Sequence, residues 1–279
     1  MTRKSFSLLA LAASLSIVGT ANAASTVGIN AAIRNKVVMR AASDPSPRAA
    51  VLKARVSLGD QVQTANASML QILLLDRSNF TVGSNARVTI DRFVYDPQRS
   101  ASAVGASVAK GAFRFISGKS VRNMPGKTAI TTPVASIGVR GTMFEGAVGP
   151  DAVRIAGREA GAAGGRVDPE TATLIVLRGP GATTTEPGGA IDVTANGETV
   201  ALDKPGMALF VPGPNQKAIG PFSLSDSGLL AIHDLLRTTP DTREALNRFD
   251  AEGNPIVDRT LENLPDRDGQ IVDIIDGPQ

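Results

Sequence analysis

The stretch RVTIDRFVY, residues 87–95, decides the fold class. In it the apolar Val88 and Ile90 alternate with the polar Thr89 and Asp91, and an Asp-Pro pair follows directly. Successive side chains of an extended chain point to opposite faces, so a period of two is typical of a β-strand with one buried face. The pattern therefore predicts a strand that ends at the Asp-Pro pair.

Similar patterns lie on both sides of this stretch. KGAFRFISG, residues 110–118, places Phe113 and Phe115 on one face with Arg114 between them, and shorter strand-like runs occupy residues 61–64 and 69–75. Within this central region, glycine and proline recur at short intervals and leave no window for a helix of ordinary length. We therefore expect an all-β fold, either a short-stranded sandwich or a short β-solenoid. Six aromatic residues between positions 80 and 144 indicate where its core is centred.

Composition divides the chain further. We expect a signal peptide at residues 1–23, a flexible entry segment at 24–50, a β domain at 51–148, a Gly/Ala-rich excursion at 149–170, additional strands or a small second lobe at 171–222, a helix at 223–239 and an acidic, largely flexible tail at 240–279. The helix is predicted because Ser223 and Asp226 fit a capping arrangement and Leu229, Ile232 and Leu236 recur at helical spacing. A second short helix from about Thr242 to Phe249 also fits, so we expect one or two C-terminal helices.

The first residues predict export. Arg3 and Lys4 precede a short apolar run at 6–18, and Ala21-Asn22-Ala23 resembles a cleavage site. The run is shorter than the ~20 apolar residues that a membrane span needs. We therefore expect cleavage after Ala23, a periplasmic location, and no membrane span in the mature protein. The chain has no cysteine, so its stability must come from a packed core rather than from disulfides.

Charge is unevenly distributed along the chain. The 29 Lys and Arg and 26 Asp and Glu nearly balance once Arg3 and Lys4 are removed, so we expect no nucleic-acid partner. Residues 241–279, however, contain ten acidic residues and four arginines, which leaves the rest of the chain basic. This tail is interpreted either as a solvated extension or as a segment that folds back onto the basic body.

Few residues are suited to catalysis or metal binding. His233 is the single histidine and lies on the predicted helix, so a half-packed helix position is the simpler interpretation. Zinc would need several Cys or His ligands, and the acidic run at 266–269 matches a calcium loop poorly. A pair of carboxylates for glycoside hydrolysis is not singled out by any spacing. We therefore expect no enzyme, no cofactor and no metal.

The most specific motif is TPVASIGVRGT, residues 132–142, and its candidate site residues are Pro133, Gly138, Arg140, Gly141 and Thr142. Proline belongs at a strand start or edge, and glycines around Arg140 indicate a close backbone approach or a positive φ. Two interpretations stay open. Arg140 either reaches across the sheet to a carboxylate or carbonyl and holds a tight turn, or it is exposed and binds an anionic partner.

Four ordered motifs resemble the FecR domain, the periplasmic module named for the ferric citrate regulator of bacteria. They are LGDQVQT at 58–64, DRFVYDP at 91–97, KGAFRFISGK at 110–119 and TPVASIGVRGT at 132–142, and the resemblance covers residues 51–148. It implies an all-β domain that, in the founding members, relays occupancy of an outer-membrane receptor to a cytoplasmic sigma factor. Those members carry a cytoplasmic segment and a membrane span before the domain, and this chain begins instead with a signal-like segment.

The resemblance therefore implies a secreted form of the family. We expect a non-catalytic periplasmic binding or signalling module whose partner is a protein or an envelope polymer. The alternatives are a structural envelope-associated protein that binds peptidoglycan or polysaccharide, and, less favoured, a carboxylate-based hydrolase.

Overall fold

The computed structural model describes residues 25–99, 101–122, 126–162, 164, 166–179 and 189–237. Their strands are β1 (Thr26–Arg34), β2 (Val37–Ala41), β3 (Asp44–Ala49), β4 (Arg55–Ser57), β5 (Gln61–Thr64), β6 (Met69–Leu74), β7 (Asn79–Val82), β8 (Arg87–Asp96), β9 (Ala101–Ile116), β10 (Thr128–Thr131), β11 (Ser136–Arg140), β12 (Met143–Val148), β13 (Thr173–Gly179), β14 (Ala190–Ala195), β15 (Glu198–Leu202), β16 (Met207–Val211) and β17 (Ile219–Ser223). Their helices are α1 (Lys119–Arg122), α2 (Pro150–Ala156), the 3-10 turn η1 (Ala160–Ala162) and α3 (Asp226–Asp234). The predicted all-β class is confirmed.

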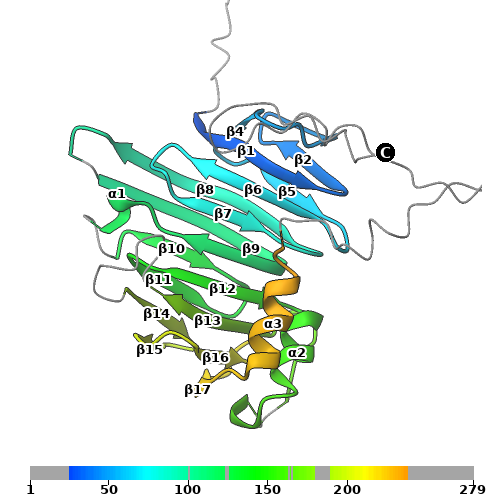
Figure 1. Cartoon of the computed structure of the whole chain (residues 1–279), viewed down its shortest axis with the longest axis vertical. Coiled ribbons are helices and arrows are strands. Elements are labelled where there is room, and N and C mark those ends of the chain that lie inside the picture. The colour runs from blue at the N-terminus through cyan, green and yellow to red at the C-terminus, as the bar shows by residue number, and fades with distance from the viewer. Residues whose placement is uncertain are drawn as a thin grey trace, which may run out of the picture.

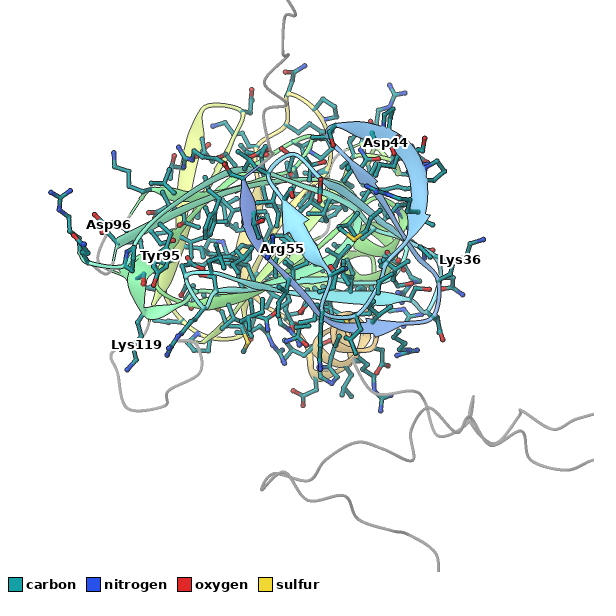
Figure 2. All side chains as sticks on the ribbon, turned by 90° about the horizontal axis from the view of Figure 1, so that it is seen from above. Lys36, Asp44, Arg55, Tyr95, Asp96 and Lys119 are labelled. Carbon is teal, nitrogen blue, oxygen red and sulfur yellow. The ribbon has the colours of Figure 1, made fainter. Side chains whose placement is uncertain are left out.

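The strands form two layers that share one strand. Sheet A has the order β4-β1-β6-β7-β9-β12-β13-β16-β17, and sheet B has the order β3-β2-β5-β8-β9-β10-β11-β14-β15. Figure 1 shows the strands stacked from β1 and β2 at one end to β15 and β17 at the other. Viewed along the stack in Figure 2, the two layers face each other, with Tyr95 and Asp96 at one end and Lys36 at the other.

The shared strand, β9, crosses from one layer to the other at Gly111. Lys110 still pairs with Arg87 in sheet B, whereas Gly111 pairs with Val148 in sheet A. Gly111 has a φ of 80°, and a Cβ at this position would come within 2.3 Å of the Cα of Ala86. Only glycine combines this backbone conformation with so close an approach, so this residue makes the crossing possible.

The core fills the space between the layers. The side chains of Phe80, Phe113, Phe115 and Phe144 are fully buried there, and neighbouring rings lie 6.0–6.3 Å apart in tilted, edge-on or stacked arrangements. Such aromatic clusters bury a large apolar area and add pairwise attraction. Four of the six aromatic residues between 80 and 144 thus lie in the core as predicted, whereas Phe93 packs against it partly buried and Tyr95 is not part of it.

A second, smaller core lies on the outer face of sheet A. Because side chains alternate along each strand, Ala112, Ala147 and Leu174 point away from the main core, and α2 and α3 pack over them with Ile155 and Ile232. Figure 1 shows both helices on one side of the lower strands. The helices therefore cover the outer face of sheet A and do not form a separate domain.

The structure differs from the sequence-based expectation in the entry segment. Residues expected to be flexible up to position 50 form β1, β2 and β3 instead. The reason is tertiary pairing, because β1 lies between β4 and β6 in sheet A and pairs with residues 26 to 46 positions away. A Cβ on Gly28 would approach the carbonyl oxygen of Leu73 to 2.4 Å, so β1 needs a glycine to sit this close to β6.

Three further segments differ from expectation or settle an open alternative. The Gly/Ala-rich excursion at 149–170 contains α2 and η1, because its alanines pack on sheet A. Strands within 171–222 join both layers, β13 beside β12 and β14 beside β11, so the described residues of this segment belong to the two layers and not to a second lobe. Helix α3 is capped by Ser225 rather than Ser223, since the Ser225 side chain accepts a hydrogen bond from the Gly228 N–H. The predicted signal peptide, the second short helix expected at residues 242–249 and the whole of the predicted tail lie outside the described residues.

Candidate functional site

The motif at 132–142 spans β11 and the turns on both sides of it. Pro133 lies in the turn between β10 and β11, and Gly138 lies within β11 opposite Asp192. Gly141, with a φ of 64°, links β11 to β12 and so carries the chain from sheet B to sheet A. The Thr142 hydroxyl donates to the carbonyl of Gly179 in the adjacent strand. Gly141 and Thr142 thus stabilise this turn.

Arg140 lies at the end of β11, and its side chain reaches across to β14. Its Nη2 is 2.8 Å from Oδ1 of Asp192, and the two side chains are 44% and 40% exposed. The carboxylate contact is therefore present, and the guanidinium also faces solvent on the outer side of sheet B. Binding of an anionic partner by Arg140 stays a prediction.

The strand beyond this ion pair, β15, forms one edge of sheet B. It pairs only with β14 among the described residues, through a hairpin whose two turn residues, Asn196 and Gly197, both have positive φ. In such a hairpin the residues flanking the turn exchange hydrogen bonds, and every second residue points its backbone groups outward. Thr199 and Ala201 therefore present N–H and C=O groups to the open edge. The Thr194 and Thr199 hydroxyls, 2.8 Å apart, fit the closer side-chain spacing of this pairing.

The other three edges of the described layers are protected. β3 contains two prolines, β17 contains Pro221, and β4 has only three residues. Proline removes a backbone donor and very short strands offer little to pair with, which are common ways of blocking an edge. β15 has neither feature. It is thus the edge best suited to accept another strand.

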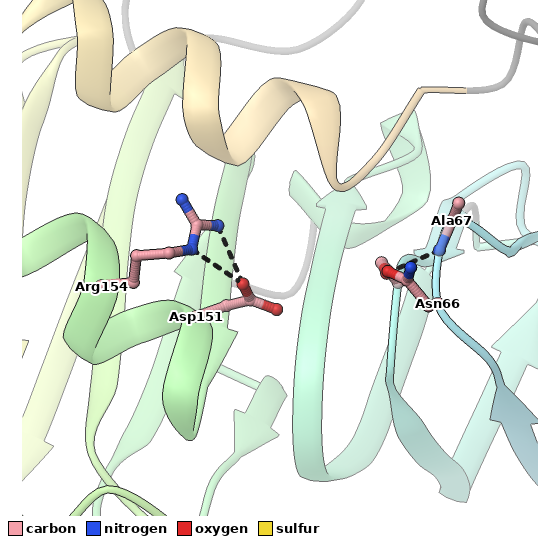
Figure 3. Close-up of polar contacts among 5 residues, drawn as sticks. Asn66, Ala67, Asp151 and Arg154 are labelled. Atoms are coloured by element: carbon pink, nitrogen blue, oxygen red, sulfur yellow. Dashed lines mark hydrogen bonds and ion pairs between the residues drawn. The ribbon is translucent and has the colours of Figure 1, made fainter. Parts of the chain in front are cut away.

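A polar pocket lies on the opposite side of the molecule, where the helices meet the ends of β1, β5 and β7. It has a volume of about 480 Å³, is open to solvent, and is lined by Arg34, Asn66, Ala67, Ser84, Arg154, Arg158, Ser227, Leu230, Ala231, Asp234 and Leu235. Three of these side chains are arginines and one is a carboxylate. Figure 3 places Asp151 and Arg154 of α2 on one side and the turn at Asn66 and Ala67 on the other, with α3 crossing above.

Hydrogen bonds hold the walls of this pocket at both ends of α3. At the helix start, Glu159 accepts hydrogen bonds from the N–H and hydroxyl of Ser225, at 3.1 and 2.7 Å. At the helix end, the Ser84 N–H donates to the carbonyl of Leu235 at 2.9 Å, and Arg34 Nη1 donates to that of Arg237 at 3.2 Å. The bond to Leu235 satisfies the C-cap carbonyl of the helix, and together these contacts fix the shape of the pocket.

A buried ion-pair cluster lies beneath α3 on the outer face of sheet A. Glu145 is 1% exposed, and its Oε1 accepts a hydrogen bond of 2.8 Å from Arg114 Nε. Arg178 Nε lies 3.3 Å from Oε2, an ion-pair contact without hydrogen-bond geometry. His233 is exposed rather than half-packed, and its Nδ1 lies 3.4 Å from Arg114 Nη2. The two arginines therefore balance the charge of the buried Glu145 carboxylate.

Metal binding is not indicated in the described part of the chain, where no group of three or more His, Cys, Asp or Glu side chains is placed to hold an ion. The acidic run at 266–269 lies outside the described residues. Nor does any described helix have the length and apolar character needed to cross a bilayer.

Sequence reasoning missed the pocket because it assigned residues 149–170 to an excursion. A signal for α2 was present: Pro150 and Asp151 are favourable in the first turn of a helix, and Arg154 follows Asp151 at the i,i+3 spacing of a helical ion pair.

The fold is that of a mostly-β protein with short helices on one face. Residues 60–161 match the family model described as FecR protein. This part of the chain is therefore a FecR domain, which confirms the resemblance. The domain contributes the pocket residues from Asn66 to Arg158, while Arg34 and α3 come from the flanking segments.

Comparison with curated proteins finds no match. Among solved structures, the chain is similar to two crystal structures titled "putative anti-sigma factor" from Parabacteroides distasonis ATCC 8503, at 2.50 and 1.65 Å resolution. The identities are 12% and 13%, the TM-score is 0.37 for both, and each match covers 57% of this chain and 57% of that chain. A likeness at this level says nothing about the partners of the protein.

Proposed function

We propose that this protein is a non-catalytic periplasmic signalling module that binds another protein through the open edge of sheet B. The FecR domain supports a signalling role, and the signal-like pattern of residues 1–23 supports the periplasmic location. Mass spectrometry of the exported protein tests the location, and an intact Met1 contradicts it.

The exposed edge of β15 is the observation that carries the proposal. Its free backbone groups can hydrogen-bond to an extended segment of a partner, a mode of recognition in which the main chain supplies affinity and side-chain contacts supply specificity. The Arg140–Asp192 pair lies on the adjacent strands, β11 and β14, and offers both charges next to that edge. A partner strand with alternating polar side chains fits this surface.

A proline substitution at the edge tests the proposal. Ala201→Pro removes an N–H that points outward, and edge strands tolerate proline at such positions. Ala201→Thr is the matched control, because it changes the side chain and keeps the N–H. Both variants and the parent carry an affinity tag and are purified from periplasm after cross-linking in the cell.

We expect a discrete cross-linked protein with the parent and with Ala201→Thr, and its loss with Ala201→Pro. Equal recovery with all three proteins contradicts the edge proposal. The protein could instead sediment with purified peptidoglycan, with Ala201→Pro making no difference. That result would favour the alternative of a structural envelope-associated protein.

A further inference from the structure

Arginines outnumber carboxylates in the lining of the pocket beside α3, by three side chains to one. Of its three arginines, Arg154 shares Oδ1 of Asp151, at 2.8 Å from Nη2, and Arg158 is exposed with no side-chain partner in the described part of the chain. The one lining carboxylate, Asp234, lies 3.5 Å from Arg237 and is largely turned to solvent. The pocket is therefore suited to an anionic ligand.

The shape of the pocket favours an extended anion over a compact one. It is open along one side, and its arginines come from three places: the end of β1, α2 and the turn after α2. Apolar wall residues on α3, including the 63% exposed Leu230, alternate with the polar ones. A peptide that carries several carboxylates and some apolar side chains matches these features.

The chain supplies such a peptide at the rim of the pocket. Arg34, a lining residue, hydrogen-bonds to the carbonyl of Arg237, the last described residue, so the chain continues from that point. Residues 241–279 then contain ten Asp or Glu and four Arg, with apolar pairs such as Ile274-Ile275 between them. A segment tethered this close has an effective concentration on the order of mM.

We propose that the acidic segment 241–279 binds the arginine-lined pocket beside α3. The interaction goes beyond the partner binding proposed for β15, on the other layer, and does not depend on it. Because ion pairs between exposed groups are screened by salt, the segment is released at high ionic strength. An anionic partner that competes for the same arginines displaces it too.

The absence of cysteine from the chain allows a direct test with the full-length protein. Leu230→Cys on the pocket wall and Gly269→Cys in the acidic segment are labelled with a fluorescent donor and acceptor. Thr199→Cys with Gly269→Cys is the control pair, because β15 lies at the edge of the other layer. Energy transfer is measured in about 20 mM and about 1 M salt, where the screening length falls to about 3 Å.

We expect efficient transfer for the 230–269 pair at low salt, at least about twofold above that of the 199–269 pair, and loss of this difference at high salt. The double substitution Arg154→Gln with Arg158→Gln should abolish the difference at low salt as well. Both side chains are exposed, so this variant should unfold at nearly the parent temperature. A melt of the labelled protein checks that it remains folded.

Equal transfer for the two pairs at low salt overturns the proposal. So does a 230–269 signal that neither salt nor the arginine substitutions change. If the segment stays away from the pocket while purified peptidoglycan binds to the parent and not to the arginine variant, the occupant is an envelope polymer and the proposal is also wrong.

Discussion

Replacing Glu145 by alanine should destabilise the protein far more than replacing Asp192, although each carboxylate pairs with arginine on a neighbouring strand. Glu145 is 1% exposed, and its partners Arg114 and Arg178 are 17% and 24% exposed, whereas Asp192 and Arg140 are about half in solvent. Removing one member of a buried pair leaves a desolvated charge without its partner and typically costs about 3–5 kcal/mol. Breaking an exposed pair costs about 0.2–1 kcal/mol.

The structure places the expected value for Glu145→Ala near the lower end of the buried range. Both guanidinium groups retain some contact with water and can be partly rehydrated once the carboxylate is gone, so we expect a loss of about 3 kcal/mol. Glu145→Gln keeps the shape and one acceptor oxygen, and should cost less than Glu145→Ala. Asp192→Ala is the matched exposed control.

Urea denaturation followed by circular dichroism measures these differences as shifts of the unfolding midpoint at a constant slope. The reasoning is refuted if Glu145→Ala and Asp192→Ala each cost less than about 1 kcal/mol, because burial would then have no bearing on the strength of the pair. A large effect of Asp192→Ala alone would refute it as well.

Three further perturbations test the fold. Gly111→Ala should cost about 2–5 kcal/mol of unfolding free energy, from the left-handed backbone and overpacking against residues 85–86, while Gly138→Ala, which meets only ordinary contacts, should stay within about 1 kcal/mol of the parent. Phe113→Ala should cost about 3–5 kcal/mol by leaving a cavity in the aromatic core, and a smaller loss in urea denaturation would contradict this packing. A hydrogen bond from the Glu170 N–H lowers the pKa of Asp168 below its ordinary value of 3.8. The stability from Asp168 is thus present above pH 3.8 and lost as the pH falls through the lower folded pKa, so Asp168→Ala and parent melts should converge in acid and differ at neutral pH.

The alternation of side chains predicted much of the β structure, for a clear physical reason. Phe113 and Phe115 face the core and Arg114 faces away because neighbouring residues of a strand point in opposite directions. The same period holds in either layer, so it does not specify which sheet a strand joins. The crossing of β9 at Gly111 depends on contact with a distant turn, which one segment of sequence does not reveal.

The candidate sites were predictable only in part. Arg140 was singled out by its glycine neighbours, and its carboxylate, Asp192, lies 52 residues away on a strand whose place in the sheet was left open. Glu145 pairs with Arg114 through the register of β12 and β9, and no local pattern joins two residues 31 positions apart. The open edge at β15 emerged only from the strand order, because an edge is defined by the absence of a neighbour.

Amide hydrogen exchange at β15 tests the central claim most directly. In the free protein, the outward N–H groups of Thr199 and Ala201 should exchange rapidly, while that of Val200, which faces β14, should be protected. On addition of the protein recovered by cross-linking, the account predicts that Thr199 and Ala201 become protected. Unchanged exchange at both residues while the complex forms would contradict recognition through this edge.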